Sequence, residues 1–217
     1  MARVSHLPTD PRAAKALTIA AYDASAAAYG DGTLALPAVV AAAADAFAGR
    51  LGAGARVLEI GSGPGRDALA LEERGLRVRR TDVSPGFVAL LRSSGHAADL
   101  LDPLVDDLAD PERDGHDGVW ANACLLHVAR SDLPVVLRRL AAVTRSGGVL
   151  HLSLKEGDGE SWSTHGNVTA PRLFTFWREE PLCAALEQAG WLVEQAGRHD
   201  GVRDDRWLQV MATRKDA

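Results

Sequence analysis

The stretch that decides the fold is VLEIGSGPGRDALAL, Val57 to Leu71. A short run of apolar and β-branched residues leads into a cluster of glycines, and the residues after the cluster are typical of the start of a helix. Glycines let the backbone approach a ligand closely, and unpaired amide groups gather at a helix N-terminus. The order of strand, glycine loop and helix therefore predicts a nucleotide site.

Strands and helices alternate along the rest of the chain. Apolar and β-branched runs predict seven strands, at residues 56–60, 76–82, 95–101, 117–123, 149–155, 191–198 and 207–213. Capping and stop signals predict helices at residues 11–28, 37–50, 66–75, 85–92 and 131–144, and one that ends at Gly190. A polar loop from Glu156 to Thr169 interrupts the alternation.

This alternation predicts an α/β fold, a three-layer Rossmann-like sandwich with a mostly parallel seven-stranded sheet. No helix separates the last two predicted strands, so we expect them to form a C-terminal antiparallel hairpin. Ligands of such sheets bind beyond the carboxyl ends of the strands. The site is therefore expected just after Ile60, Thr81, Ala98, Ala121 and Leu154.

The composition narrows the class of protein. The 217 residues are 47% hydrophobic and 24% charged, and a net charge of -5 without any block of Lys or Arg argues against a nucleic-acid partner. Cys124 and Cys183 lie far apart, which predicts reduced thiols in a cytoplasmic protein. The first twelve residues have no apolar core and the tract from Leu34 to Ala44 is short, so we expect no secretory signal and no membrane partner. The sequence contains no Cys/His cluster and no carboxylate pair of the kind that predicts a metal site.

Three ligand classes compete for the glycine loop. A phosphate-binding P-loop requires a Lys and then Ser or Thr after the glycines, and GSGPGRD has no such pair. A dinucleotide loop spaces its third glycine differently, and Arg66 stands where that helix must pack closely. The stretch EIGSGPGR, an acid followed by Gly-x-Gly-x-Gly, resembles the first motif of class I S-adenosylmethionine-dependent methyltransferases.

The resemblance extends from Ala55 to Lys155. Asp82 closes the second predicted strand, where this family carries its ribose-binding acid. Asp99, followed by Leu100, stands where the family holds the adenine. DGVWANACLLHV resembles the fourth-strand motif, and RSGGVLHLSLK resembles the turn and strand that follow. The resemblance implies that S-adenosylmethionine is the cofactor.

The resemblance also implies roles for individual residues. Asp82 would accept hydrogen bonds from both ribose hydroxyls and Asp99 from the adenine amino group. Glu59 would orient the loop from beneath. The cofactor-binding residues expected in this way are Tyr22, Glu59, Gly61, Ser62, Gly63, Gly65, Arg66, Asp82, Val83, Asp99, Leu100 and Asn122. Alternatives are that Glu59 is a locally paired buried acid, that Asp82 is a strand-end cap, and that a nearby acid (Asp102, Asp106 or Asp107) replaces Asp99.

The acceptor side is less well defined. His127 follows the fourth predicted strand and is the first candidate for a catalytic general base, although it could equally pack against or cap the next helix. His151 alternates with leucines and is expected to be a buried structural histidine. Lys155 leaves its strand at the site end and would bind an anionic substrate, or be a plain surface lysine.

The N-terminal segment AYDASAAAYGDGT resembles the lid of small members of the family. Tyr22 and Tyr29 would donate hydrogen bonds to the cofactor carboxylate or the substrate, or simply pack. His165 and Arg172 lie in or beside the polar loop and are further substrate-binding candidates, with Arg172 suited to a carboxylate. The cluster LFTFW at residues 173–177 would wall an apolar pocket or belong to the core.

The sequence thus predicts a single domain over residues 1–217, with an N-terminal helical lid at 1–50 and a Rossmann-like core at 51–217. We expect a methyltransferase that transfers a methyl group to an oxygen or nitrogen of a small molecule, for example a secondary metabolite, as a monomer or homodimer. The alternatives are a nicotinamide-dependent oxidoreductase and a non-catalytic cofactor-binding protein of the same fold.

Overall fold

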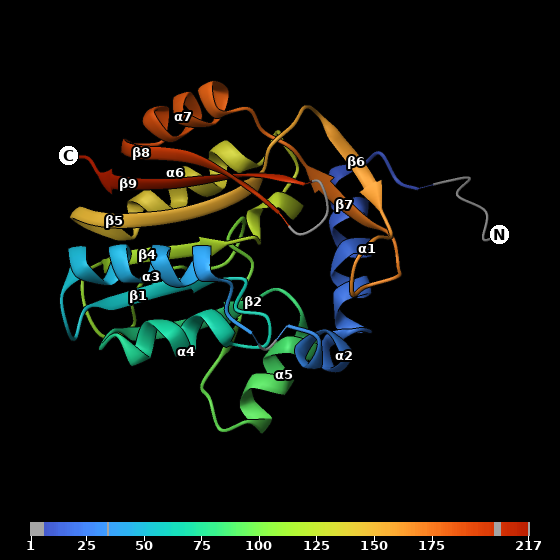
Figure 1. Ribbon diagram of the computed structural model, residues 1–217, viewed down its shortest axis with the longest axis horizontal. Helices are drawn as coiled ribbons and strands as arrows, with labels where there is room; N and C mark the ends of the chain where they lie inside the picture. The colour runs from blue at the N-terminus through green and yellow to red at the C-terminus, as the bar shows by residue number, and fades with distance from the viewer. Residues whose placement is uncertain (1–6, 34, 202–204, 217) are drawn as a thin grey trace.

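The computed structural model describes residues 7–33, 35–201 and 205–216. A seven-stranded sheet runs through the molecule in the order β3-β2-β1-β4-β5-β9-β8 (Figure 1). Its strands are β1 (Arg56–Ile60), β2 (Arg77–Asp82), β3 (Asp99–Leu100), β4 (His116–Asn122), β5 (Thr144–Lys155), β8 (Trp191–Asp200) and β9 (Arg206–Arg214). The first five are mutually parallel, and β9 runs antiparallel to both β5 and β8. The predicted sheet and its terminal hairpin are confirmed.

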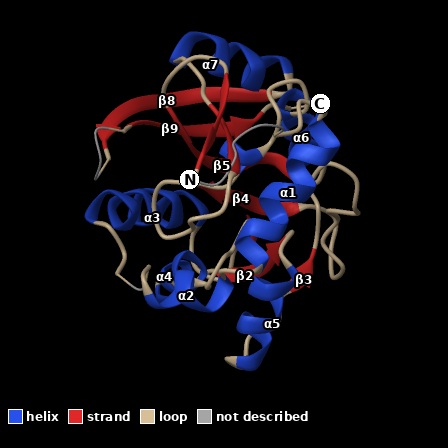
Figure 2. Cartoon of the chain, turned by 90° about the vertical axis from the view of Figure 1, so that its right-hand side faces the viewer, coloured by secondary structure: helices blue, strands red, loops and turns tan. Residues whose placement is uncertain are grey.

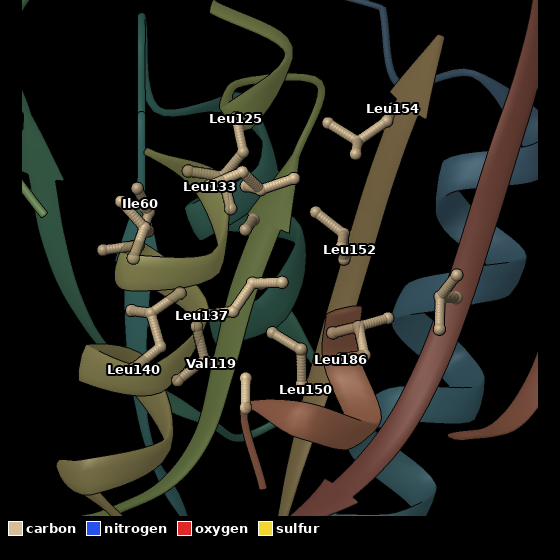
Figure 3. Packing of buried hydrophobic residues seen from close by; sticks show 14 of the residues in the cluster. Ile60, Val119, Leu125, Leu133, Leu137, Leu140, Leu150, Leu152, Leu154 and Leu186 are labelled. Carbon is tan, nitrogen blue, oxygen red and sulfur yellow. The ribbon is translucent and has the colours of Figure 1, made fainter. Parts of the chain in front are cut away.

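Helices cover both faces of the sheet. One face packs against α3 (Ala38–Leu51) and α4 (Arg66–Glu73), with Phe47 of α3 against Trp120 of β4. The other face packs against α6 (Leu133–Ala142) and α7 (Glu179–Gln188), and Figure 3 shows leucines of both helices meeting β4 and β5. Successive residues of the central strands point to opposite faces of the sheet. Val57 therefore packs on the side of α3 and α4, and Leu58 packs on the side of α6 and α7. The three-layer sandwich is therefore as predicted.

A cap covers one end of this sandwich. We use this name for α1 (Pro11–Asp23), α2 (Ala26–Asp31) and the antiparallel hairpin of β6 (Glu160–Ser163) and β7 (Arg172–Thr175). In Figure 1 the cap lies on the right, where β1 and β4 end, and Figure 2 shows α1 crossing in front of the sheet from that side. It therefore lies over the carboxyl ends of the parallel strands, where ligands of such sheets bind.

Local signals explain where several helices begin. Asp10 accepts a hydrogen bond from the amide of Ala13, and Ser84 accepts one from Phe87 at the start of α5 (Pro85–Ser93). Proline follows both caps, at the position where a missing N–H costs nothing. Both predicted helix starts are confirmed.

Four expected element bounds were wrong. The helix predicted from Pro11 to Ala28 breaks after Asp23, because that carboxylate turns away to accept hydrogen bonds from α5. The polar loop predicted over residues 156–169 contains β6, which finds its partner β7 further along the chain. The strand expected over 95–101 is reduced to β3, and Thr144 begins β5 instead of ending a helix. Leu34, at the start of the predicted apolar tract, lies outside the described residues.

The LFTFW cluster belongs mainly to the core. Phe174 and Trp177 are buried among the residues between the sheet, α6 and α7. No helix in the described ranges is long and apolar enough to cross a membrane.

Candidate functional site

The glycine loop joins β1 to α4 in a conformation that excludes side chains. Gly61 has a φ of 71°, and a Cβ built on it would lie 2.4 Å from the Cβ of Cys124. Gly65 has a φ of 89°, and its Cβ would lie 2.6 Å from a methyl carbon of Leu91. Both positions therefore require glycine. The tight turn leaves the amide of Gly63 free to point at the end of β2.

Asp82 ends β2 and is buried directly beside this loop. One carboxylate oxygen accepts from the amide of Gly63 at 2.8 Å, and the other accepts from the amide of Ser84 at 2.8 Å. Burial nevertheless raises the pKa of Asp82 above its ordinary value. The carboxylate also lines a hollow, and each of its oxygens keeps lone pairs for a donor there.

Glu59 lies beneath the loop and contacts it through Ser62. The Ser62 hydroxyl hydrogen-bonds to the Glu59 carboxyl and accepts from the amide of Thr81 at 3.1 Å. Burial raises the pKa of Glu59 to about 8. The Ser62 hydroxyl is therefore committed to holding β1, β2 and the loop together.

Two adjoining hollows flank the loop. The larger has a volume of about 150 Å³ and lies under the cap, and the smaller, of about 90 Å³, lies towards α4. Five residues line both hollows: Tyr29, Ile60, Gly61, Gly63 and Ala123. Asp82 and Val83 line the larger one, while Glu59, Ser62, Arg66 and Asn122 line the smaller. Most of the predicted cofactor-binding residues are thus brought together.

The smaller hollow is organised by Asp67, which sequence reasoning missed. Its carboxylate accepts from the Asn122 amide at 2.7 Å, the Trp120 indole at 3.1 Å and the Arg66 guanidinium at 2.9 Å. The Asn122 oxygen in turn accepts from Ser153 at 2.6 Å. An acid in the first turn of the helix after a glycine loop was a usable signal for this role.

His127 also lines the larger hollow, from a short 3₁₀ turn after β4. Its Nε2 is 2.7 Å from the hydroxyl of Tyr22, and its Nδ1 is 2.7 Å from the carbonyl oxygen of Leu173. Burial lowers the pKa of His127 to about 4 and raises the pKa of Tyr22 to about 12. Both side chains are therefore neutral at pH 7.

Arg172 is 4% exposed and lies behind Tyr22. Its guanidinium donates to the Tyr22 hydroxyl at 3.2 Å, to the carbonyl of Val168 at 3.0 Å and to the carbonyl of His165. No carboxylate of the described chain forms an ion pair with it. His165 itself is exposed and contributes its backbone. Neither Arg172 nor His165 is among the residues that line the two hollows.

Asp99 and Leu100 also lie outside both hollows, contrary to expectation. Asp99 pairs with Arg79 at 2.8 Å, and Leu100 is 54% exposed. The chain turns into the site just after the short β3, where the amide of Leu101 donates to the carbonyl of Asp82. Leu101 and Asp102 line the larger hollow instead. Asp102, one of the acids that could replace Asp99, is thus the one that lines the larger hollow.

Lys155 lies near His127 but lines neither hollow. It pairs with Asp205 at 2.9 Å and lies 4.8 Å above the ring of Phe174. His151 is fully buried and stacks on Trp120, as expected of a structural histidine.

Sequence reasoning predicted Tyr22 and a helical lid but missed three other residues of α1 that line the larger hollow, Lys15, Thr18 and Ile19. Lys15, Thr18, Ile19 and Tyr22 follow one another at helical spacing and line the larger hollow along one face of α1. That spacing was readable in the sequence, but the face that the helix turns to the sheet was not. Across residues 7–33, 35–201 and 205–216, no group of three His, Cys, Asp or Glu side chains suits a metal ion.

Comparisons with known proteins agree with this geometry. A family described as "Methyltransferase domain" matches residues 58–152, from β1 to β5. The segment from β1 to β5 is thus similar to methyltransferase domains. The resemblance found in the glycine loop and the strands after it is confirmed, and the matched segment contains Asp82 and His127.

Curated relatives match part of the domain. The ubiquinone biosynthesis O-methyltransferase of Xanthomonas axonopodis pv. citri is 33% identical over 105 residues, which are 46% of this chain and 43% of that protein. The corresponding enzyme of Xanthomonas euvesicatoria pv. vesicatoria matches to the same extent. The chain thus matches less than half the length of these relatives.

Solved structures match the fold over nearly the whole domain. The 1,6-didemethyltoxoflavin-N1-methyltransferase of Burkholderia thailandensis, solved with 1,6-didemethyltoxoflavin and S-adenosylhomocysteine, gives a TM-score of 0.76 at 23% identity and covers 98% of this chain and 94% of its own. The N-methyltransferase NodS of Bradyrhizobium japonicum, solved with S-adenosylhomocysteine, gives 0.61 at 15% identity over 81% and 86% of the two chains. The class I methyltransferase fold is confirmed.

Proposed function

We propose that this protein is an S-adenosylmethionine-dependent methyltransferase that methylates an oxygen or nitrogen atom of a small molecule. The observation that carries the proposal is the buried carboxylate of Asp82, held by the Gly63 and Ser84 amides beside a glycine loop that excludes side chains. A buried carboxylate with free lone pairs suits a ligand that presents hydroxyl donors and no phosphate. The ribose diol of S-adenosylmethionine is such a ligand.

The residues around the two hollows fit the rest of the cofactor. Asp82 would take the ribose at the junction. The smaller hollow, with Arg66, Asn122 and the amides of the loop, is polar and would take the amino-acid part. Leu101 and Asp102, together with Val83, would hold the adenine in place of Asp99 and Leu100. When bound, the cofactor supplies an electrophilic methyl group.

The cap side of the larger hollow would receive the acceptor. Its walls are mainly apolar, with Ile19 of α1, Leu104 and Val128 facing it. An enclosed apolar site excludes water and aligns the acceptor for an in-line displacement. The two groups of relatives are named for an oxygen acceptor and a nitrogen acceptor, which supports both types of atom.

The cap completes the arrangement. We take residues 1–217 as one domain in which residues 1–50 act as a helical lid over the core at 51–217. Thr18 and Tyr22 hold this lid to β7 and to His127. A cytoplasmic location, a small-molecule substrate and a monomeric or homodimeric state complete the proposal.

Turnover tests the proposal. The protein is incubated with S-adenosylmethionine and a panel of small phenols, amines and carboxylates, and formation of S-adenosylhomocysteine is measured. We expect turnover with at least one protic acceptor. Binding of S-adenosylhomocysteine without turnover on any member of a broad panel would favour a non-catalytic cofactor-binding protein instead.

A further inference from the structure

The hydrogen bonds around His127 fix its tautomer. The carbonyl oxygen of Leu173 can accept but not donate, so the Nδ1 atom at 2.7 Å from it must carry the hydrogen. Because the neutral ring has one N–H, Nε2 is left with a lone pair. The Tyr22 hydroxyl, 2.7 Å from Nε2, must therefore donate its hydrogen to His127.

Arg172 fixes a second direction at the same oxygen. A guanidinium has donors and no acceptor, so the 3.2 Å contact is a hydrogen bond from Arg172 to the Tyr22 oxygen. The Tyr22 hydroxyl thus donates its hydrogen to His127 and accepts one from Arg172 with one lone pair. One lone pair remains, because the described residues form no other hydrogen bond with this oxygen. Tyr22 lines the larger hollow, so it offers an acceptor and no donor to a ligand there.

This orientation is held from behind. The guanidinium of Arg172 lies 5.4 Å from the ring centre of Tyr22 and 5.2 Å from that of Phe174. Its other hydrogen bonds go to the carbonyls of Val168 and His165 in the cap. A buried cation fixed in this way cannot turn to present a donor to the hollow, and it keeps the Tyr22 oxygen supplied with a donor on that side.

We propose that Tyr22 is the residue that recognises the acceptor atom, and that it selects a protic acceptor, a hydroxyl or an amine, over a carboxylate. A group X–H donates to the remaining lone pair of the Tyr22 oxygen, whereas a carboxylate oxygen would face that lone pair with its own. The inference rests on the proposed function, because it concerns the acceptor of the same methyl transfer.

The same array provides a path for the proton. As the methyl carbon exchanges its bond to sulfur for a bond to X, the X–H proton passes to the Tyr22 oxygen and the phenol proton passes to Nε2 of His127. The sulfur becomes neutral, and the charge it loses ends on the imidazolium. Burial and the nearby cations Arg172 and Lys155 disfavour that imidazolium, so it returns the proton to solvent when the product leaves. His127 thus acts through Tyr22.

The hydrogen-bond directions can be tested on the ligand-free protein. In ¹⁵N-histidine-labelled protein at pH 7, long-range ¹H–¹⁵N spectra should show His127 with a protonated Nδ1 and a bare Nε2. Tyr22→Phe should shift the Nε2 signal. Tyr29→Phe is the matched control, because the Tyr29 hydroxyl has no hydrogen bond to His127, and it should leave the signal in place. A protonated Nε2 in the wild type would overturn the inference, whatever the variants do.

The acceptor class can be tested with three simple probes. Phenol, aniline and benzoate are titrated at pH 7 into protein saturated with S-adenosylhomocysteine. We expect phenol and aniline to bind at least about tenfold more tightly than benzoate, and Tyr22→Phe to remove the difference. Benzoate binding as tightly as phenol, or no binding of any probe, would overturn the selection of protic acceptors. Failure of S-adenosylhomocysteine itself to bind would instead refute the proposed function.

Discussion

The two ends of the site are built in different ways. At the cofactor end, the contacts of the glycine loop with β2 join residues about twenty positions apart, as Gly63 and Asp82 are. At the acceptor end, Tyr22 meets His127 across 105 positions, and Thr18 meets Leu173 across 155. Backbone groups and obligatory glycines dominate the first, and side chains from the cap dominate the second. Local spacing encodes the cofactor end, whereas the tertiary fold assembles the acceptor end.

The largest expected effect is at the cofactor end. Asp82→Asn removes the charge from hydrogen bonds to the ribose, and we expect about a 100-fold loss of S-adenosylhomocysteine affinity by calorimetry, or about 2.7 kcal/mol. Asp99→Asn is the matched control, because Asp99 pairs with Arg79 outside both hollows. The affinity of this variant for S-adenosylhomocysteine should stay within twofold of the wild-type value. Equal losses in both variants would restore the original assignment of Asp99.

The acceptor end should respond in stability rather than in cofactor affinity. Thr18→Val keeps the shape but leaves the buried amide of Leu173 without its partner at 3.0 Å, at a cost of about 1–3 kcal/mol in urea unfolding. Ser93→Ala, on the exposed side of α5, should change stability by less than about 0.5 kcal/mol. A Thr18→Val protein that is fully stable but binds S-adenosylhomocysteine weakly would break the separation of the two ends.

His151 lies in β5, stacked on Trp120, and gives a pH-dependent test. Burial lowers its pKa from about 6.5 to about 3, and neither ring nitrogen has a partner. Below pH 6.5 the unfolded chain binds a proton that the folded one does not, so stability falls as the pH drops towards 3.

His151→Leu removes this contribution and two unpaired polar atoms. The slope of unfolding free energy against pH between 4 and 6 should decrease by about 1.4 kcal/mol per pH unit. At pH 8, His151 of the wild type is neutral in both the folded and the unfolded protein. Only the pH-independent difference in stability between the wild type and His151→Leu should therefore remain. An unchanged slope would mean that His151 is already protonated or solvated in the folded protein.

The smallest effect is a local one at the cofactor end. Ser84→Ala removes the side-chain cap of α5, whose hydroxyl accepts from Phe87 at 3.3 Å, and should cost about 1 kcal/mol of stability. Because Asp82 is held by the Ser84 amide and not by its hydroxyl, S-adenosylhomocysteine affinity should change little. A tenfold loss of affinity would show that the Ser84 hydroxyl also shapes the ribose site.

Much of the cofactor end could be predicted from the sequence. The glycine spacing, the acid at the end of β2 and the final hairpin are fixed by strand and turn patterns over short distances. Asp99 was misplaced because the two-residue β3 has no periodicity from which its register follows. Asp67, one residue into α4, was overlooked because its three partners come from elsewhere in the fold.

The acceptor end was predicted in its residues but not in their arrangement. Tyr22, His127 and Arg172 were all candidates, yet the hydrogen-bonded chain that joins them depends on how α1 and the β6–β7 hairpin meet. The hairpin itself was hidden, since β6 has a polar sequence and its partner β7 lies after a loop. The strand end of Lys155 left substrate binding and a plain surface position equally open, and the ion pair with Asp205 could not be read from the sequence.

The central claim is that the glycine loop and Asp82 hold a phosphate-free nucleotide. Calorimetric titration of the wild-type protein with S-adenosylhomocysteine and, separately, with NADH tests it most directly. The structure predicts binding of S-adenosylhomocysteine at one site per chain and no binding of NADH. Binding of NADH in the absence of S-adenosylhomocysteine binding would contradict the account and make the site that of an oxidoreductase.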